Sequence, residues 1–323
     1  MKRLVTLALI AGAVIGLAVG AWLLVSWNAA GPADKPVPVI VPEGASLSRA
    51  AEAMEKAGAL SSADSFLFQA KLFGGGTPIQ AGEYEVPAKA SPSDILALMQ
   101  SGKTLQRFIT IPEGYPSVMV HDKLMAANTL VGNVPVPEEG SVLPDSYSYQ
   151  RGETRAAVLK RMQDAMTREL DRLWPKRQPH SVVNNKREAI ILASVVEKET
   201  GKPSERPMVA SVYSNRIRIG MKLDADPTVI YPITKGRPLG RRILRSELNA
   251  NNGYNTYAMA GLPAGPIANP GRESIAAVLN PAKSDALYFV ADGTGGHIFA
   301  RTLAEHNANV RKWYAIRRAR GEM

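Results

Sequence analysis

The longest hydrophobic run of the chain lies at its N-terminus. Residues 4–27 read LVTLALIAGAVIGLAVGAWLLVSW and include no charged side chain. A helix needs about 20 predominantly apolar residues to cross the hydrocarbon core of a bilayer. The run therefore predicts one membrane-spanning helix.

Shorter alternations of apolar and polar positions follow the run. VIVPEGASLS (39–48) and ITIPEGYPSV (109–118) each predict an apolar strand, a Pro-Glu-Gly turn and the start of a helix. Ser91 and Pro92 then suit the N-cap and first position of another helix, and Gly102 suits its end. These patterns predict a small domain of short strands and helices.

The second half of the chain predicts longer helices. We expect one near 153–174, one from about 186 to 200, and one capped by Ser204 and ending at Gly220. KLDADPTVIYP (222–232) is predicted to be extended, and 249–271 is a long, Asn- and Gly-rich loop. ALYFVADGTGGHIFAR (286–301) predicts a β-hairpin, and Thr302 with Glu305 a capping box for the last helix.

Helices and short strands alternate without a βαβ rhythm, so we expect an α+β fold in both soluble parts. The predicted layout is a cytoplasmic stub and transmembrane helix (1–27), a Pro- and Ala-rich linker (28–38), a small module (39–104) and a larger domain (105–323).

The charges beside the hydrophobic run predict its orientation. Lys2 and Arg3 precede it, and the positive-inside rule then places the N-terminus in the cytoplasm and the remainder outside. A cleaved signal peptide, cut near residue 30, is the alternative, although its apolar part is usually shorter.

Composition excludes several classes of chemistry. The chain of 323 residues has no cysteine, which excludes disulfides, thiolate catalysis and cysteine-ligated zinc. His121, His180, His297 and His306 lack ligand spacing, and no phosphate-binding, zinc-protease or serine-hydrolase motif occurs, so no cofactor or metal is expected. The net charge of +10 suits acidic polymers or anionic membranes; outside the cytoplasm, nucleic acid is not an expected partner.

LASVVEKETG (192–201) carries the most suggestive acids. On a helical wheel, Glu199 falls beside Leu192, Val195 and Val196, whereas Glu197 lies about 160° away on another side. An apolar setting raises a carboxyl pKa, and a protonated glutamic acid can donate to a glycosidic oxygen. The alternative is an ordinary solvated helix end.

Three long segments of the chain are distinctive: ASVVEKETGKPSERPMVASVYSNRIRIGMKLDADPTVIYP (193–232), YNTYAMAGLPAGPIANPG (254–271) and YFVADGTGGHIFARTLAEHN (288–307). They resemble the YceG-like (MltG) family of endolytic murein transglycosylases. Two departures are EGSVLPDSYSY (139–149), which lacks the family's Phe, and the Pro ending DPTVIYP, where the family has Gly.

The resemblance implies an enzyme anchored by a single pass in the cytoplasmic (inner) membrane, with its catalytic domain in the periplasm. The 39–104 module would be LysM-like. Glu199, the second glutamate of E-K-E-T, would be the catalytic residue, and we expect Asp226, Asn255 and Tyr257 to orient the sugar. Peptidoglycan glycan strands would be the substrate, with synthases of the elongation or division machinery as candidate partners.

The implied reaction cleaves the β-1,4 bond between N-acetylmuramic acid and N-acetylglucosamine and leaves 1,6-anhydro ends. One carboxyl group can act first as acid and then as base, so no second acid is required. Two alternatives remain open at this point: a peptidoglycan-binding scaffold without turnover, and a hydrolase of the same bond.

Overall fold

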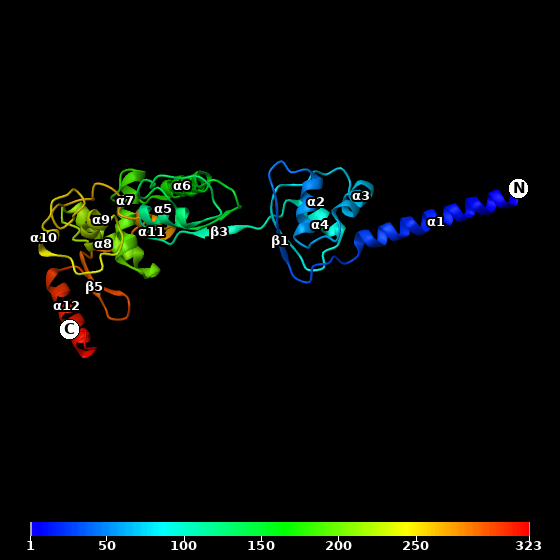
Figure 1. The fold of residues 1–323 in the computed structure, drawn as a ribbon. Coiled ribbons are helices and arrows are strands. Elements are labelled where there is room, and N and C mark those ends of the chain that lie inside the picture. The colour runs from blue at the N-terminus through cyan, green and yellow to red at the C-terminus, as the bar shows by residue number, and fades with distance from the viewer. Residues whose placement is uncertain (1, 323) are drawn as a thin grey trace. The chain divides into compact units, whose positions relative to one another are not determined.

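The computed structural model describes residues 2–322, without the side chains of residues 2–5 and 8. The chain divides into two compact units (Figure 1). The small unit contains the chain up to Arg107 together with Tyr149–Arg151, and the large unit contains Phe108–Ser148 and the chain from Gly152 onward. Each unit is described on its own. The overall mixture of helices and short strands confirms the predicted α+β class.

The N-terminal run is a single helix, α1 (Lys2–Asn28), as predicted. Its Leu9–Asn28 segment is long and apolar enough to cross a membrane, a property that a signal sequence also has. The side chains of Lys2 and Arg3, which carry the predicted orientation, lie outside the described part of the structure.

The small unit packs three helices against a two-stranded antiparallel sheet. Strands β1 (Val37–Val41) and β2 (Gly82–Val86) pair in register from Val37↔Val86 to Val41↔Gly82. The helices are α2 (Leu47–Lys56), α3 (Ala63–Phe73) and α4 (Pro92–Ser101). Ser91 caps α4 through a capping box with Asp94, as the sequence predicted. Helix α3, capped by Ser62, was not predicted.

The C-terminal end of α1 belongs to the core of the small unit. Trp27 is only 6% exposed, and its ring centroid lies 5.8 Å from that of Phe66 and 6.2 Å from that of Phe73. Gln69 Nε2 donates to Ser26 Oγ at 2.7 Å. The small unit therefore includes the last turn of the predicted membrane helix.

The predicted linker also lies against the small unit. Gly31 N donates to Lys89 O, and Lys89 N donates to Ala33 O at 2.7 Å. A side chain at Gly31 would meet Ala90 O at 2.2 Å, so the backbone approaches closely here. Part of 28–38 is thus held by hydrogen bonds and does not act as a free spacer.

Helices are the main regular secondary structure of the large unit. Its helices are α5 (Ser117–Ala126), α6 (Arg155–Leu173), α7 (Lys186–Glu199), α8 (Arg206–Arg218), α9 (Asp226–Thr234), α10 (Arg245–Leu248), α11 (Arg272–Leu279) and α12 (Leu303–Ala319). Short 3₁₀ turns occupy Trp174–Lys176 and Pro203–Glu205. Strands β3 (Arg107–Thr110) and β4 (Ser146–Tyr149) form one two-stranded sheet, and β5 (Tyr288–Ala291) and β6 (His297–Ala300) form the predicted hairpin.

Helix α7 runs through the core of the large unit. Every residue from Ala189 to Val196 is buried, and α7 packs against α8, α9 and α11. A helix that is apolar on all sides must be covered on all sides. The two ends of α7 reach the edge of this core, and the C-terminal turn carries Glu197 and Glu199.

One sequence prediction is wrong: residues 222–232 are not extended, because α9 begins at Asp226. The β-branched run Thr228–Ile230 favours a strand locally. However, Pro227 in the first turn needs no hydrogen-bond donor and has the φ of a helix, and Thr228 and Val229 are buried in the large unit. Helix α8 also begins later than predicted, with Glu205 rather than Ser204 at the N-cap.

The two similar segments do fold alike. β1 leads through Gly44 into α2, and β3 leads through Gly114 into α5. Gly44 has φ +71° and Gly114 has φ +70°, a left-handed conformation that glycine adopts without strain. The predicted strand–turn–helix unit is therefore confirmed in both places.

Candidate active site

The candidate site forms at the C-terminal end of α7. Asn185 caps the other end, where its side chain accepts from Glu188 N at 2.9 Å. The helix stops at Glu199 because Thr200 is extended, with φ −135° and ψ 128°. Residues two positions apart on a helix face different directions, so Glu197 and Glu199 leave the core on different sides.

Glu199 has a carboxyl group that is buried without a hydrogen bond to one of its oxygens. The residue as a whole is partly exposed, but Oε1 is inaccessible and has no partner among the described residues. Burial raises the pKa of this carboxyl to about 7, because it disfavours the charged form. The hydrogen bond from the Tyr213 hydroxyl lowers the pKa, the negative charge of Asp226 raises it, and the positive charge of Arg216 lowers it.

The direction of this shift agrees with the prediction from the helical wheel. Leu192, Val195 and Val196 are all 0% exposed and form part of the core. The wheel did not include Tyr213, which lies on α8 and whose own pKa is raised well above its usual value, mainly by burial.

Asp226 and Tyr257 form a hydrogen-bonded pair next to Glu199. The Tyr257 hydroxyl donates to Asp226 Oδ1 at 2.7 Å. Burial, followed by this hydrogen bond, raises the pKa of Tyr257, and the charge of Glu199 contributes in the same direction. The hydroxyl therefore remains a protonated donor. Two of the three predicted sugar-orienting residues thus lie close enough to Glu199 to act on it electrostatically.

Asn255, the third of these residues, is fully buried. Its Nδ2 donates to the carbonyl oxygens of Glu247, Leu248 and Ala250, at 3.2, 2.9 and 2.8 Å. Its Oδ1 accepts from Tyr257 N at 2.9 Å. Since no part of Asn255 is exposed to a sugar, it can act only by holding the loop and Tyr257 in place.

Two buried threonines, not anticipated from the sequence, tie this loop to the start of α9. Thr256 Oγ1 lies 2.8 Å from Thr228 Oγ1 and accepts from Ala225 N at 3.1 Å. Thr256 N in turn donates to Thr228 Oγ1 at 3.1 Å. These bonds hold Tyr257 beside Asp226, although the two residues are far apart in sequence.

Arg216 is a second residue that the sequence did not reveal. Its side chain is nearly buried and donates to Leu287 O and Leu223 O, each at 2.7 Å. A cation held by backbone carbonyls can affect Glu199 without forming a direct ion pair with it. Arg216 lies in the last turn of α8, where basic side chains are common, so the sequence VYSNRIR (212–218) gave no signal that it is buried.

Glu197 is fully partnered, in contrast to Glu199. Its Oε1 accepts from Arg206 at 3.0 Å and its Oε2 accepts from Gly271 N at 2.9 Å, and its side chain is 5% exposed. Arg206 also pairs with Glu113 at 2.6 Å and Glu273 at 2.5 Å. Arg206 thereby links the ends of four segments of the large unit.

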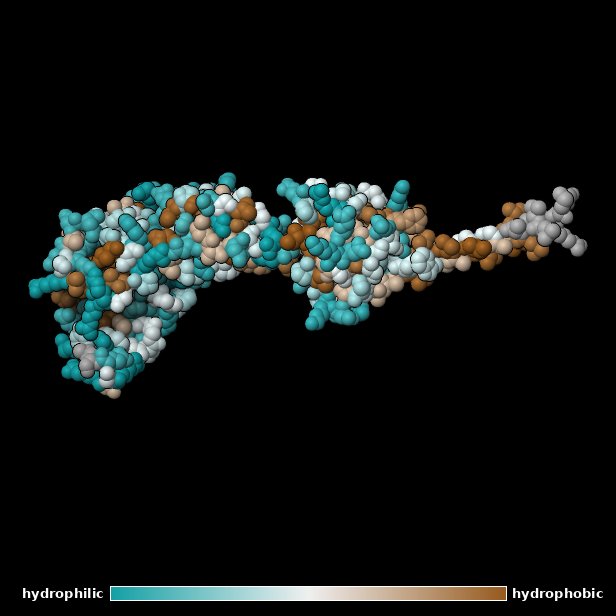
Figure 2. Space-filling model, viewed as in Figure 1, coloured by the Kyte–Doolittle hydropathy of each residue, from teal (hydrophilic) through white to brown (hydrophobic). Residues whose placement is uncertain are grey.

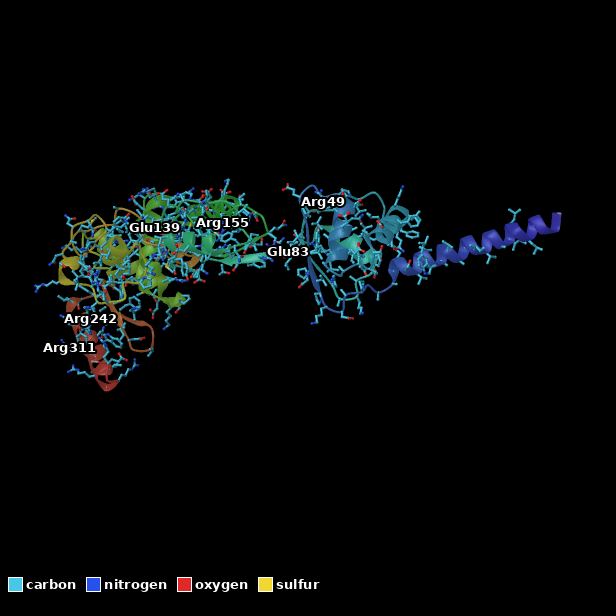
Figure 3. All side chains as sticks on the ribbon, in the orientation of Figure 1. Arg49, Glu83, Glu139, Arg155, Arg242 and Arg311 are labelled. Carbon is cyan, nitrogen blue, oxygen red and sulfur yellow. The ribbon has the colours of Figure 1, made fainter. Side chains whose placement is uncertain are left out.

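Glu139, a partly buried acid of the large unit, is labelled in Figure 3. Burial raises its pKa, and hydrogen bonds from Ser117 oppose that shift. It accepts from Ser117 N at 2.9 Å and Ser117 Oγ at 3.1 Å. Glu139 is a satisfied acceptor, which suits a structural role more than proton transfer.

His297 lies beside Glu205, with its Nδ1 2.7 Å from Glu205 Oε2. The ring of His297 is therefore already paired with a carboxylate of the large unit. Among the described residues, no group of three or more His, Cys, Asp or Glu side chains could hold a metal ion.

A cavity of about 400 Å³ borders this end of α7. Its lining includes Lys198 and Pro227, the chain neighbours of Glu199 and Asp226. The other lining residues are mostly apolar and come from the 114–116 turn, the start of α5, α9 and the 236–239 turn. A concave surface therefore lies beside the residues next to Glu199 and Asp226 in sequence, although neither acid itself lines it.

Comparisons with known proteins identify the family to which the chain is similar. A model of the YceG-like family matches residues 39–312. An endolytic murein transglycosylase of Bacillus subtilis is 29% identical over 310 residues, covering 86% of this chain and 84% of the relative. An endolytic murein transglycosylase of Streptococcus pneumoniae is 29% identical over 325 residues, covering 85% of this chain and 58% of the relative. The crystal structure of a yceG-like protein from Listeria monocytogenes is 28% identical, with a TM-score of 0.53 over 85% of this chain and 99% of the other.

Proposed function

The chain belongs to the YceG-like family, and from that membership we propose that it is an endolytic murein transglycosylase. It is then a lyase that cuts the bond between N-acetylmuramic acid and N-acetylglucosamine within a glycan strand of peptidoglycan. The observation that carries the proposal is the carboxyl of Glu199, which is buried, unpaired at Oε1, and has a pKa of about 7.

Glu199 acts twice in the proposed mechanism. The protonated carboxyl donates its proton to the glycosidic oxygen, and the bond to the muramyl C1 breaks as positive charge develops on that sugar ring. The resulting carboxylate then takes the proton of the muramyl C6 hydroxyl, whose oxygen bonds to C1. A pKa near 7 suits both steps, because acid and base forms are both accessible. Activity should fall as pH rises well above 7.

We assign supporting roles to the residues around it. Asp226 and the hydroxyl of Tyr257 would hydrogen-bond to the sugar, and the Tyr257 ring would provide an apolar face. Asn255 would position Tyr257 through the bond between its Oδ1 and Tyr257 N. The negative charge of Asp226 also keeps Glu199 protonated at higher pH, which favours the first step.

The origin of the oxygen atom that becomes bonded to the muramyl C1 tests the proposal, because it comes from the C6 hydroxyl in a transglycosylase and from water in a hydrolase. Purified murein is digested by the full-length protein in heavy-oxygen water, and the products are weighed by mass spectrometry. We expect 1,6-anhydromuramyl ends without label, and almost no product from Glu199→Gln. A protein that only binds murein would release no fragments at all.

A hydrolase of the same bond is the second candidate, because a second carboxylate, Asp226, acts electrostatically on Glu199. Glycosidases that use water generally need two carboxyl groups around the bond. Incorporation of one heavy oxygen at each new end, lost in Asp226→Asn, would favour this candidate.

We also propose that α1 is retained as a single-pass anchor, with the N-terminus in the cytoplasm and the chain after α1 outside. Burial of Trp27 in the small unit supports retention, because a cut near residue 30 would remove that ring from a formed core. The small unit would be a LysM-like module that binds glycan, and synthases would be partners of the large unit. N-terminal sequencing of the mature protein tests retention, and a start near residue 30 would contradict it.

A further inference from the structure

Helix α3 exposes apolar side chains on the surface of the small unit. Phe68, Leu72 and Phe73 are 56%, 54% and 37% exposed, and we name these three residues the α3 patch. Phe68 and Leu72 are four positions apart and therefore lie on one face. The opposite face of α3, including Phe66 and Ala70, is already buried in the core. Phe68 and Leu72 are thus not needed to hold the small unit together, whereas Phe73, at the end of the helix, also packs on the core residue Trp27.

The α3 patch lies beside the end of α1. The ring centroid of Phe73 is 6.2 Å from that of Trp27, and Gln69 on α3 donates to Ser26 on α1. Trp27 is the last residue of the hydrophobic run, so the edge of a bilayer that α1 crosses lies near it. In Figure 2, hydrophobic residues cover much of α1 and reappear on the small unit beside the point where α1 enters it.

We propose that the α3 patch is a membrane-contact surface, inserted into the interface of the same bilayer that α1 spans. The hydrophobic run of α1 ends at Trp27, which places the edge of the bilayer near this residue, and the patch lies at the same level because its own Phe73 packs on the buried Trp27 ring. Lys71, exposed between Phe68 and Leu72 in the sequence, suits the anionic headgroups beside them. The inference rests on retention of α1 and is independent of the catalytic proposal.

The consequence is a fixed placement of the small unit. One helix crossing a membrane leaves an attached domain free to tilt. A second apolar contact beside that helix restricts the tilt, because any movement away from the surface would expose the α3 patch to water. The small unit would therefore lie on the membrane.

The absence of cysteine allows a direct test on the full-length protein. Phe68→Cys and Leu72→Cys are each labelled with an environment-sensitive fluorophore and reconstituted into vesicles of phosphatidylethanolamine and phosphatidylglycerol. Ile40→Cys is the matched control, because Ile40 is also apolar and 47% exposed but lies on β1. Figure 1 shows β1 on the side of the small unit away from α1.

We expect lipids with a nitroxide on the acyl chain to quench both α3 labels at least roughly twofold more than the Ile40 label, as for side chains at the acyl boundary. Equal quenching at all three positions would overturn the proposal. Disulfide-linked dimers of unlabelled Phe68→Cys would also overturn it, because a second copy would then cover the patch. Having two independent positions keeps the test valid if one variant fails to fold.

Discussion

Two carboxyl groups, two residues apart on one helix, lie in opposite surroundings. Glu197 has a buried guanidinium and a backbone N–H as partners, whereas Glu199 has a buried oxygen without a hydrogen bond. Pairing stabilises an ionised carboxylate, and burial without pairing stabilises the protonated acid. The difference shows how one helix end can provide both a structural anchor and a group available for proton transfer.

The largest expected difference between the two acids is in turnover. Glu199→Gln keeps the shape of the side chain but cannot transfer a proton, so we expect cleavage to fall roughly a hundred- to ten-thousandfold. Glu197→Gln should lose less activity, because Glu197 is engaged with Arg206 and Gly271. Initial rates of fragment release from murein, with binding measured by co-sedimentation, check both. Wild-type turnover by Glu199→Gln would remove the distinction.

The buried ion pair of Glu197 should matter more for stability than for turnover. Arg206→Met leaves Glu197 buried without its cation, and breaking one side of a buried pair costs about 3–5 kcal/mol of unfolding free energy. Arg237→Met is the matched control, because Arg237 pairs with Asp122 where both side chains are about half exposed, and such pairs contribute under about 1 kcal/mol. Urea denaturation measures both losses. Equal losses of unfolding free energy would mean that the Arg206 pair stabilises the fold no more than an exposed ion pair does.

The pH dependence of stability isolates the burial of Glu199. Its folded pKa of about 7 exceeds the ordinary value of 4.5, so the folded state binds the proton more tightly than the unfolded state. Its contribution is therefore fully present below about pH 4.5 and is lost as pH rises through about 7. At about 1.4 kcal/mol per pKa unit, the loss reaches about 3 kcal/mol.

Glu199→Gln should remove this dependence, because glutamine does not titrate. The unfolding free energies of wild type and variant, measured from pH 4 to 9, should diverge across that window in favour of the variant. Parallel curves would show that Glu199 is solvated and ionised like an ordinary helix-end acid.

The smallest expected effect concerns the hydroxyl that Tyr257 donates to Asp226. Tyr257→Phe removes one hydrogen bond to a charged group, and we expect turnover to fall roughly five- to tenfold, with little change in melting temperature. Tyr257→Ala should lower it further if the ring contacts the sugar. A collapse of the melting temperature in Tyr257→Phe would make the residue structural.

Local signals in the sequence predicted much of the fold. An uncharged run predicted α1, and caps at Ser91 and Thr302 predicted two helices whose capping boxes are present. Such features depend on neighbouring residues and can be inferred without tertiary structure. Residues 222–232 are the counterexample, because the β-branched residues that favour a strand are buried on a helix that begins beside Pro227. Local preference is weak compared with burial in a core.

The sequence by itself determined that Glu199 follows an apolar helix and belongs to a recognisable motif. Only the tertiary structure decided that Glu197 meets Arg206, Glu113 and Gly271, and that Glu199 meets Tyr213, Asp226 and Tyr257 instead. These partners come from other elements of the large unit, tens of residues away in several cases. The pKa of a buried carboxyl depends on what surrounds it in space, and helical periodicity gives only the side from which those surroundings approach.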